Sequence, residues 1–353
     1  MHQAHIEQMQ EEQRRYGHVR SVVSATFRGF KFVAVGNELH QSKDWKTFPD
    51  FLFYYIRYVF GRDWGLAEMR KPQTERHQIV QWYSHVCRYQ KLQQRGPNGL
   101  YAMEPDGITA AYMLLAYDLY VLRHHQHLQD LVVRRLKDAN QFQGARFELL
   151  VAATLVRSGC DLQFEDESDP TTKHPELVAT HRETGEAFDV EAKSRHRPGV
   201  LGFSGEREKP EAMKLGIRRL LNRASEKCGS RPLAVFLDLN LPPELVAPSN
   251  QEWLNEVRTE IERLAIDANA VWPFALAVIT NHPDHYGQFA EAKPPQMGYI
   301  VEPQGTVRNP LKQPGIADDI ERALRQYGTI PNWFPDESDS RRLPSGWNAN
   351  GAT

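Results

Sequence analysis

The stretch PELVATHRETGEAFDVEAKS, residues 175–194, carries the strongest structural signal in the chain. Apolar and ionisable residues alternate over residues 188–193, which predicts a strand whose two faces differ in polarity. A second strand at residues 177–180 precedes it, and the polar turn between them contains a glycine, so we expect a hairpin. A hairpin of this length brings Glu176 beside Glu191. The polar face of the later strand carries Asp189, Glu191 and Lys193.

An acid two residues before a lysine occurs at three places, residues 44–46, 191–193 and 291–293. This spacing arises easily by chance, so its surroundings must distinguish the three. Asp44 lies in a polar loop before a helix, where we expect a surface position. Glu291 is soon followed by two prolines, which a central strand does not tolerate. Residues 191–193 are therefore the candidate site, and an exposed strand with a ladder of ion pairs is the alternative.

Glu148 is a further candidate because it lies on the apolar side of a predicted helix at residues 145–158. Positions 144, 148, 151, 152 and 155 share one helical face, and the other four are Gly, Val, Ala and Leu. A carboxylate on that face points toward the sheet rather than toward solvent. The alternative is that Glu148 interacts with the positive end of the helix dipole.

At 353 residues the chain is long enough for two domains, and the polar stretch at residues 137–144 is the best boundary. Before it, residues 21–35 predict one or two strands, and residues 48–137 have helical periodicity. After it, short strands alternate with helices, which predicts α/β architecture. Beyond the hairpin we expect a helix at 209–227, a strand at 233–241, a helix at 253–266 and a strand at 275–280. The expected domains are a mostly helical N-terminal domain (1–139), a mixed sheet flanked by helices (140–333) and a flexible tail (334–353).

Composition excludes several classes of protein. No run of 18 apolar residues occurs, so we expect no membrane span, and the N-terminus lacks the apolar core of a secretory signal. Three widely spaced cysteines form neither a disulfide framework nor a zinc ribbon and indicate a cytoplasmic protein. Glycine-rich phosphate loops and the serine-hydrolase motif are missing. His124, His125 and His127 have no local acidic or cysteine partners, so we interpret them as a polar helix end.

Residues 193–231 are basic, with 11 Lys and Arg against 4 Asp and Glu. Arg195 and Arg197 follow the lysine of the candidate site in a loop that contains glycine. The next helix then carries a row of cations suited to backbone phosphates, formed by Arg219, Arg223 and Lys227. Taken singly, each of these is more often a solvated surface charge, but as a group beside the candidate site they predict phosphate contacts. No major-groove motif is evident, so no base specificity is expected.

The helix segment Gly144-Ala145-Arg146-Phe147-Glu148, then Pro175-Glu176 and then Glu191-Ala192-Lys193, resembles the restriction-endonuclease-like superfamily of PD-(D/E)xK nucleases. The resemblance covers residues 140–240 and does not extend to residues 1–139. It implies a restriction-endonuclease-like mixed sheet flanked by helices, with Glu148 matching a helix glutamate of many members. The family usually has Asp after the proline, whereas Glu176 is a longer carboxylate that can still ligate a hard cation.

The resemblance also implies a role for each residue. Glu176 and Glu191 would bind the divalent metal, and Lys193 would assist the attacking water. Mg²⁺, with Mn²⁺ as a substitute, suits two carboxylates plus substrate phosphate, and the carbonyl of Ala192 is a further expected ligand. Asp189 is expected to hold a second metal or a metal-bound water. Burial and nearby cations would lower the pKa of Lys193 and Glu191 would raise it, so the direction stays open.

We therefore expect a Mg²⁺-dependent DNA endonuclease, with duplex DNA as its substrate, that acts in bacterial restriction or anti-phage defence. The N-terminal domain would direct the enzyme to its target, or would form the contacts of a homodimer or a multiprotein complex. Two alternatives stay open. One is a nuclease fold that no longer cuts and binds nucleic acid or protein, with an aromatic N-terminal working surface that includes Trp45, Trp64 and Trp82. The other is cleavage of structured RNA.

Overall fold

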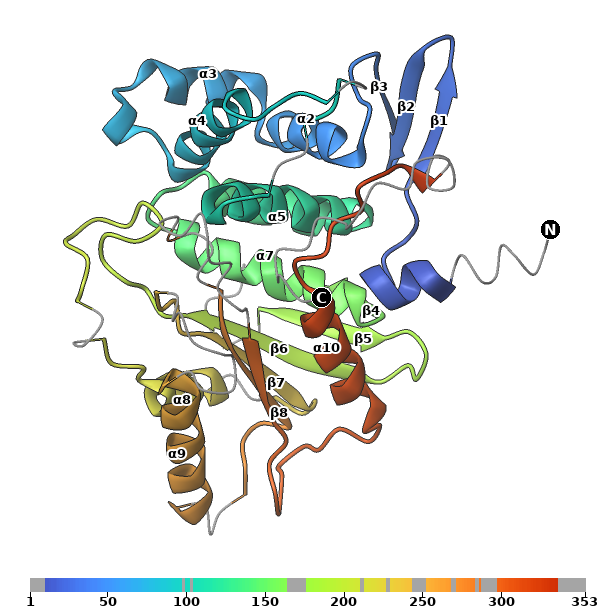
Figure 1. Cartoon of the computed structure of the whole chain (residues 1–353). Coiled ribbons are helices and arrows are strands. Elements are labelled where there is room, and N and C mark those ends of the chain that lie inside the picture. The colour runs from blue at the N-terminus through green and yellow to red at the C-terminus, as the bar shows by residue number, and fades with distance from the viewer. Residues whose placement is uncertain are drawn as a thin grey trace. The chain divides into compact units, whose positions relative to one another are not determined.

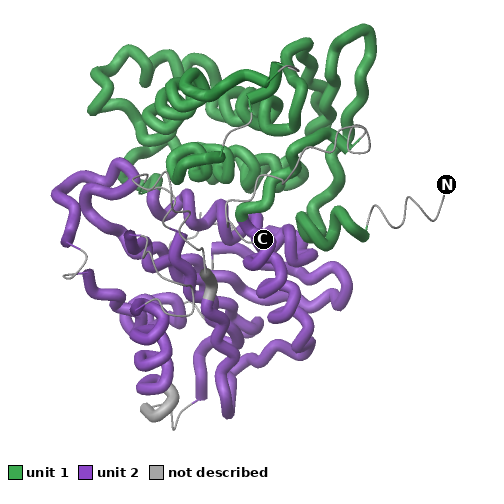
Figure 2. The backbone as a smooth tube through the Cα atoms, viewed as in Figure 1, with its two compact units in different colours: residues 1–142, 284–293, 328–353 green, residues 143–283, 294–327 purple. Residues whose placement is uncertain are grey.

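The computed structural model describes residues 10–96, 99–101, 104–163, 176–209, 213–226, 229–242, 252–267, 271–282, 286 and 297–335. The chain divides into two compact units, which Figure 2 colours separately. Unit 1 comprises residues 1–142, 284–293 and 328–353, and unit 2 comprises residues 143–283 and 294–327. The division after residue 142 lies close to the boundary expected from the sequence.

Unit 1 combines a small sheet with a group of helices. The sheet is antiparallel and has the order β1 (Val23–Phe27), β2 (Phe30–Val35), β3 (Glu38–Ser42). The sequence predicted one or two strands here, and the third forms because the turn at Gly36, with φ of 58°, returns the chain along β2. The α-helices that follow this sheet are α2 (Phe48–Phe60), α3 (Arg62–Arg70), α4 (Gln78–Lys91), α5 (Gly107–Val121) and α6 (Gln126–Leu136).

The core of unit 1 surrounds α5, which is buried from Thr109 to Val121 because it is apolar on every side. Asp106 caps its first turn by accepting a hydrogen bond from the N–H of Thr109 at 2.8 Å. Rings of α2 pack against it, as in the contact of Phe48 with Tyr120 at 5.1 Å between centroids. Within the described residues, no helix combines the length and the apolar character that a bilayer crossing requires.

Two of the tryptophans expected on a working surface lie in this core. Trp45 and Trp82 are only 8% and 1% exposed. Trp64 is half-buried, and its ring contacts Phe60 at 5.2 Å and His77 at 5.3 Å. The aromatic density of the N-terminal half is thus used mainly for packing.

Phe334, predicted at the start of a flexible tail, is fully buried in unit 1. Its ring meets the ring of Phe48 edge-on at 5.9 Å, and the ammonium of Lys31 lies 4.7 Å from its centroid. The N–H of Phe48 also donates to the carbonyl of Asn332 at 3.1 Å. These contacts attach residues 328–335 to unit 1, whereas the sequence placed them in the second domain and the tail.

Unit 2 is built on a six-stranded mixed sheet, as predicted for an α/β domain (Figure 1). Strands β4 to β6 are antiparallel neighbours, β6 to β8 are parallel, and β9 is antiparallel to β8. The strands, in their order across the sheet, are β4 (Cys160–Gln163), β5 (Leu177–His181), β6 (Ala187–Ser194), β7 (Leu233–Asp238), β8 (Leu276–Asn281) and β9 (Met297–Val301).

Among the described residues, the helices that accompany this sheet are α7 (Phe142–Arg157), α8 (Ile217–Ser225), α9 (Glu252–Asp267) and α10 (Gly315–Gln326). Apolar side chains of α8 and α9 share one core with Val235 and Leu237 of β7. The predicted basic helix at 209–227 is shorter than expected, because Gly216 adopts a left-handed φ of 67° and the helix begins after it. Strand β9 and helix α10 were not predicted.

Candidate active site

The candidate site is built on the hairpin of β5 and β6, which confirms the predicted pairing. Leu177 pairs with Val190 in the antiparallel register, and Glu176, the residue before β5, therefore lies opposite Glu191. The turn is closed by a hydrogen bond from the N–H of His181 to the carbonyl of Glu186 at 2.9 Å. Local alternation and a tight turn are sufficient to place the two glutamates together.

Three of the predicted site residues meet at Lys193. Its Nζ donates to Oε1 of Glu176 at 2.7 Å and also contacts Oε1 of Glu191. The second oxygen of Glu176 accepts a hydrogen bond from the N–H of Ala192 at 2.8 Å. Because both carboxylates touch one ammonium nitrogen, their nearest oxygens lie close together.

The environment of these groups is mostly closed to water. The side chain of Glu191 is fully buried, that of Glu176 is 11% exposed and that of Lys193 is 27% exposed. Burial alone favours the neutral amine, but the charges of the two carboxylates outweigh burial and raise the pKa of Lys193 above its ordinary value. The direction that the sequence left open is therefore upward, and Lys193 is an ammonium in this arrangement.

The pairing of β6 with β7 explains the apolar surroundings of Glu191 and Lys193, two of the three charged residues of β6. In the parallel register Glu191 lies beside Val235, and Lys193 lies beside Leu237. Both partners belong to the apolar core under α8 and α9. Charges in such surroundings interact more strongly than charges in water, since few solvent dipoles screen them.

Asp189, expected to hold a second metal or a metal-bound water, is instead engaged by an arginine. It is 1% exposed, and its carboxylate forms an ion pair with Nε of Arg231. A Cβ on Gly229 would lie 3.2 Å from its Oδ2, so this carboxylate is closely enclosed. A buried carboxylate needs such a partner, and Asp189 ties the beginning of β6 to the loop before β7.

Glu148 points away from solvent, as predicted, and is 8% exposed. Helix α7 begins at Phe142, so Glu148 lies beyond the first turn, which weakens the explanation based on the helix dipole. Its Oε1 and the Nε2 of His196 lie 3.9 and 3.5 Å from the position that a Cβ on Gly144 would take. Glu148 therefore lies near the chain that leaves the carboxyl end of β6.

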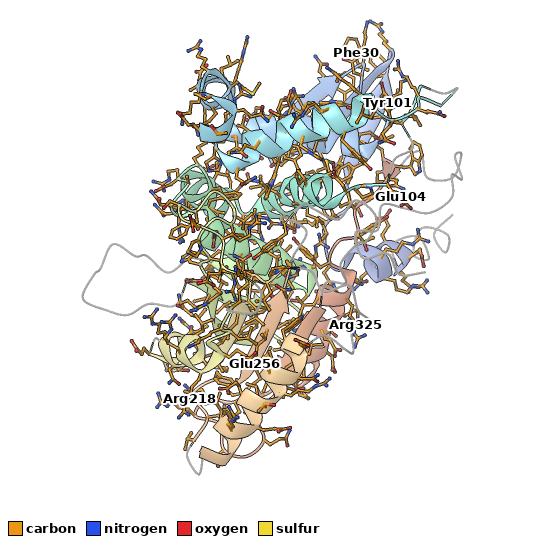
Figure 3. The ribbon with its side chains drawn as sticks, turned by 60° about the vertical axis from the view of Figure 1, so that its left-hand side comes forward. Phe30, Tyr101, Glu104, Arg218, Glu256 and Arg325 are labelled. Carbon is orange, nitrogen blue, oxygen red and sulfur yellow. The ribbon has the colours of Figure 1, made fainter. Side chains whose placement is uncertain are left out.

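The expected basic surface is present in part. Arg219 and Arg223 are exposed and lie one turn apart on α8, near Arg218, which Figure 3 labels. Burial, followed by the charges of Arg219 and Arg197, lowers the pKa of Arg195, so these cations are close enough to repel one another. Lys227, predicted in the same row, lies outside the described residues.

Arg197 does not belong to that surface, contrary to the prediction, because it is 1% exposed. Its Nε donates to the carbonyl of Leu239 at 3.1 Å, and its Nη1 pairs with Glu208 at 3.1 Å. The N–H of Arg197 donates to Oε1 of Gln143 at 3.0 Å. These bonds fix the loop after β6 and leave the guanidinium unable to reach a phosphate in solvent.

Asp238 is a buried acid near the site that the sequence did not single out. It ends β7, pairs with Ser194 across the parallel register and is 6% exposed. Burial raises its pKa to about 7, against the effect of hydrogen bonds from the backbone N–H groups of Asn240 and His282. The available signal was an acid at the end of an otherwise apolar strand.

Within the described residues, no three His, Cys, Asp or Glu side chains come together as a ready-made metal cage. The carboxylates of Glu176 and Glu191 are thus a pair and not part of a larger cluster of such groups. Of the competing tripeptides, Asp44 is exposed as expected, and residues 291–293 lie outside the described residues.

No protein-family model matches the sequence, and no curated protein or solved structure matches the chain.

Proposed function

We propose that unit 2 has a restriction-endonuclease-like fold and hydrolyses phosphodiester bonds of DNA with the help of Mg²⁺. One observation carries the proposal: Glu176, from the start of one strand, and Glu191, from the next strand, converge on the ammonium of Lys193. Two carboxylates and a lysine at this spacing are the groups that the resemblance to PD-(D/E)xK nucleases requires. The mixed sheet and the helix that carries Glu148 support the same fold.

The residues fit a divalent cation of small size. Glu176 and Glu191 already share one cation, Lys193, and their charges leave the group of three at a net −1. Mg²⁺ is typically held by one or two carboxylates, with water and substrate phosphate completing its shell, so two protein carboxylates are sufficient. Glu176 and Glu191 would hold the ion, and the carbonyl of Ala192 is the expected third protein ligand. When bound, the ion would neutralise phosphoryl charge and polarise a water.

Cationic side chains of the protein would orient the reacting groups and bind the substrate backbone. Lys193 is an ammonium held in place by two carboxylates, so it acts as a hydrogen-bond donor that orients the attacking water or a phosphoryl oxygen. Arg219 and Arg223 provide exposed charge on α8 for the backbone of the substrate. The proposed setting, bacterial restriction or anti-phage defence, rests on the resemblance alone.

A second candidate function is a nuclease-fold subunit that binds nucleic acid or protein without cutting. The hydrogen bonds of Glu176 favour this function. Both of its carboxylate oxygens accept one, from the ammonium of Lys193 and from the N–H of Ala192. An acid held in this way is available to a metal only if the contact with the ammonium is exchanged.

Cleavage assays with matched variants separate the two functions. The full chain is incubated with supercoiled plasmid, linear duplex DNA and structured RNA, in Mg²⁺, in Mn²⁺ and in EDTA. The active enzyme predicts metal-dependent cleavage of DNA that falls at least about a hundredfold in Glu191→Gln, because one carboxylate ligand is lost. Glu183→Gln, an exposed glutamate in the turn of the same hairpin, is the control and should cut normally. Absence of metal-dependent cleavage in the unmodified chain would favour the second function.

A further inference from the structure

The three-stranded sheet of unit 1 has an exposed apolar face. Strand register places Val23, Ala34 and Leu39 in one row, and it places Phe27 beside Phe30. Val23, Phe27 and Leu39 are 66%, 61% and 66% exposed, which is unusual for large apolar side chains that share one surface. We call this surface the outer face; its apolar residues include Val23, Phe27, Phe30, Phe32, Ala34 and Leu39.

The opposite face of the same sheet is part of the core of unit 1. Val33 is fully buried, and His40 is 6% exposed with its ring 4.7 Å from that of Tyr58 on α2. The buried positions of this inner face contrast with the exposed apolar positions of the outer face. The core does not explain the aromatic residues of the outer face, so they need another explanation.

Cations lie over two of the aromatic rings of the outer face. The guanidinium of Arg28 lies 5.1 Å from the centroid of Phe27, and the ammonium of Lys43 lies 4.6 Å from the centroid of Phe30. Figure 3 labels Phe30, which begins β2 at the hairpin turn. None of the positions of β1, β2 and β3 that point to this face is acidic. The face thus presents flat rings with positive charge beside them.

The position of Arg28 comes at a conformational cost. Arg28 and Gly29 form the two-residue turn between β1 and β2, with φ of 50° and 78°. Turns with two positive φ values favour Asn-Gly or Gly-Gly, because a side chain crowds the backbone in the left-handed region. The arginine at this point lies over the ring of Phe27 and places a positive charge at the outer face in spite of its left-handed backbone.

We propose that the outer face binds single-stranded DNA, with bases stacked on Phe27, Phe30 and Phe32 and phosphates beside Arg28 and Lys43. Aromatic rings at the surface, with cations close to them, are the usual surface for unpaired nucleic acid, since every base offers a flat face. Phe27 is exposed, and Phe30 and Phe32 are half-buried. Rings of Phe30 and Phe32 are 6.3 Å apart, so neighbouring stacking positions exist. This inference goes beyond the proposed hydrolysis, because binding to unit 1 needs neither the metal nor the site in unit 2.

The composition of the face fits a DNA strand better than a second copy of the chain. Gln41 is the one polar side chain that the register directs to this face, so few groups are available to bond a ribose 2′-hydroxyl, and a DNA strand loses no contact by lacking it. A symmetric dimer through the face would place the same surface on both partners and bring Arg28 and Lys43 toward like charges. A polyanion meets these cations with opposite charge instead.

Binding of a fluorescein-labelled oligo(dT) of about 20 nucleotides, measured by anisotropy in EDTA, tests the inference. The informative variant is Phe27→Leu, which keeps an exposed apolar side chain but removes the ring. Stacking predicts at least about a fivefold rise in Kd for Phe27→Leu and a similar effect for Arg28→Ala at low salt. Leu92→Ala, which changes an 81% exposed leucine of unit 1, is the control and should bind as the unmodified chain does.

Several outcomes would overturn the proposal. These are failure of the unmodified chain to bind oligo(dT), equal affinity of Phe27→Leu, or tighter binding of oligo(U) than of oligo(dT). A change of oligomeric state in Phe27→Leu, with DNA affinity unchanged, would instead identify the face as a contact between copies. Because the assay contains no metal, these outcomes leave the proposed hydrolysis untouched, and loss of cleavage in Glu191→Gln leaves this inference untouched.

Discussion

Oε1 of Glu176 lies 2.7 Å from Nζ of Lys193, although 17 residues separate them in the chain. The register of the β5–β6 hairpin produces this contact, and Glu191 on the same strand as Lys193 adds a second carboxylate. Two acids that would otherwise repel each other in a buried place are held together by one ammonium. The stability of the site and the metal binding proposed for it would therefore be linked through Lys193.

Removing the ammonium should make the site dependent on a metal. In Lys193→Met, the carboxylates of Glu176 and Glu191 face each other without a cation, and we expect a loss of about 3 kcal/mol in unfolding free energy in EDTA. Added Mg²⁺ should restore more stability to this variant than to the unmodified chain, since the ion replaces the missing charge. Urea titrations with and without Mg²⁺ measure both effects.

Lys214→Met, which removes an exposed lysine of unit 2, is the control for this experiment. It should change the unfolding free energy by less than about 0.5 kcal/mol and leave the effect of Mg²⁺ unaltered. An identical response of Lys193→Met and the unmodified chain to Mg²⁺ would show that the two carboxylates do not hold the ion.

The exposed arginines of α8 should contribute to DNA affinity through charge alone. We expect Arg219→Ala combined with Arg223→Ala to weaken duplex binding at low salt and to reduce the slope of log K against log salt by about 2, because two phosphate contacts are lost. Arg258→Ala with Arg263→Ala, on the neighbouring helix α9, removes the same charge elsewhere. If both double variants lower the slope equally, α8 has no special role.

The parts of the site that the sequence predicted correctly depend on local structure. Alternation and a glycine turn define the hairpin, so the meeting of Glu176 with Glu191 follows from residues close in sequence. Arg197 was misassigned because its burial depends on Gln143 and Leu239, which are far away along the chain. A basic run in a sequence cannot distinguish an arginine that points to solvent from one that fixes a loop.

The same reasoning explains the remaining differences. Helix α8 starts late because a single backbone conformation, at Gly216, interrupts a pattern that is otherwise helical. Asp189 and Glu191 are both acids on the same face of β6, so the sequence pattern does not distinguish them. The ion pair of Asp189 with Arg231, which only the folded structure shows, separates their roles. The polar residues near the C-terminus suggested a tail, whereas Phe334 finds a partner, Phe48, from the opposite end of the chain.

Phe334 should therefore contribute to stability as a core residue does. Phe334→Ala empties a fully buried position beside Phe48 and Lys31, and we expect a loss of about 3–5 kcal/mol in unfolding free energy. Urea denaturation followed by tryptophan fluorescence measures the change. Leu92→Ala, at an 81% exposed position, serves as the comparison and should cost little. If Phe334→Ala lowers the free energy of unfolding by less than about 1 kcal/mol, Phe334 does not act as a core residue and belongs to the tail, as the sequence predicted.

The charge of Asp238 should make the stability of unit 2 depend on pH. Burial raises its pKa from 3.8 to about 7, with the hydroxyl of Thr280 and the charge of Arg197 acting in the opposite direction. The carboxyl of Asp238 therefore binds its proton more tightly in the folded state than in the unfolded state. Its contribution to the free energy of unfolding is complete below pH 4 and is lost as the pH rises to about 7. Each pH unit in this range costs up to about 1.4 kcal/mol.

Asp238→Asn isolates this effect because an amide has no comparable titration. Relative to the unmodified chain, the variant should gain about 2–3 kcal/mol of unfolding free energy between pH 5 and pH 8, whatever its stability at pH 5. Asp161→Asn, at an exposed position of β4, should show no such gain. The comparison requires urea titrations of three proteins at two pH values. If the difference between Asp238→Asn and the unmodified chain is the same at both, Asp238 is ionised throughout, and Arg197 then balances its charge inside the fold.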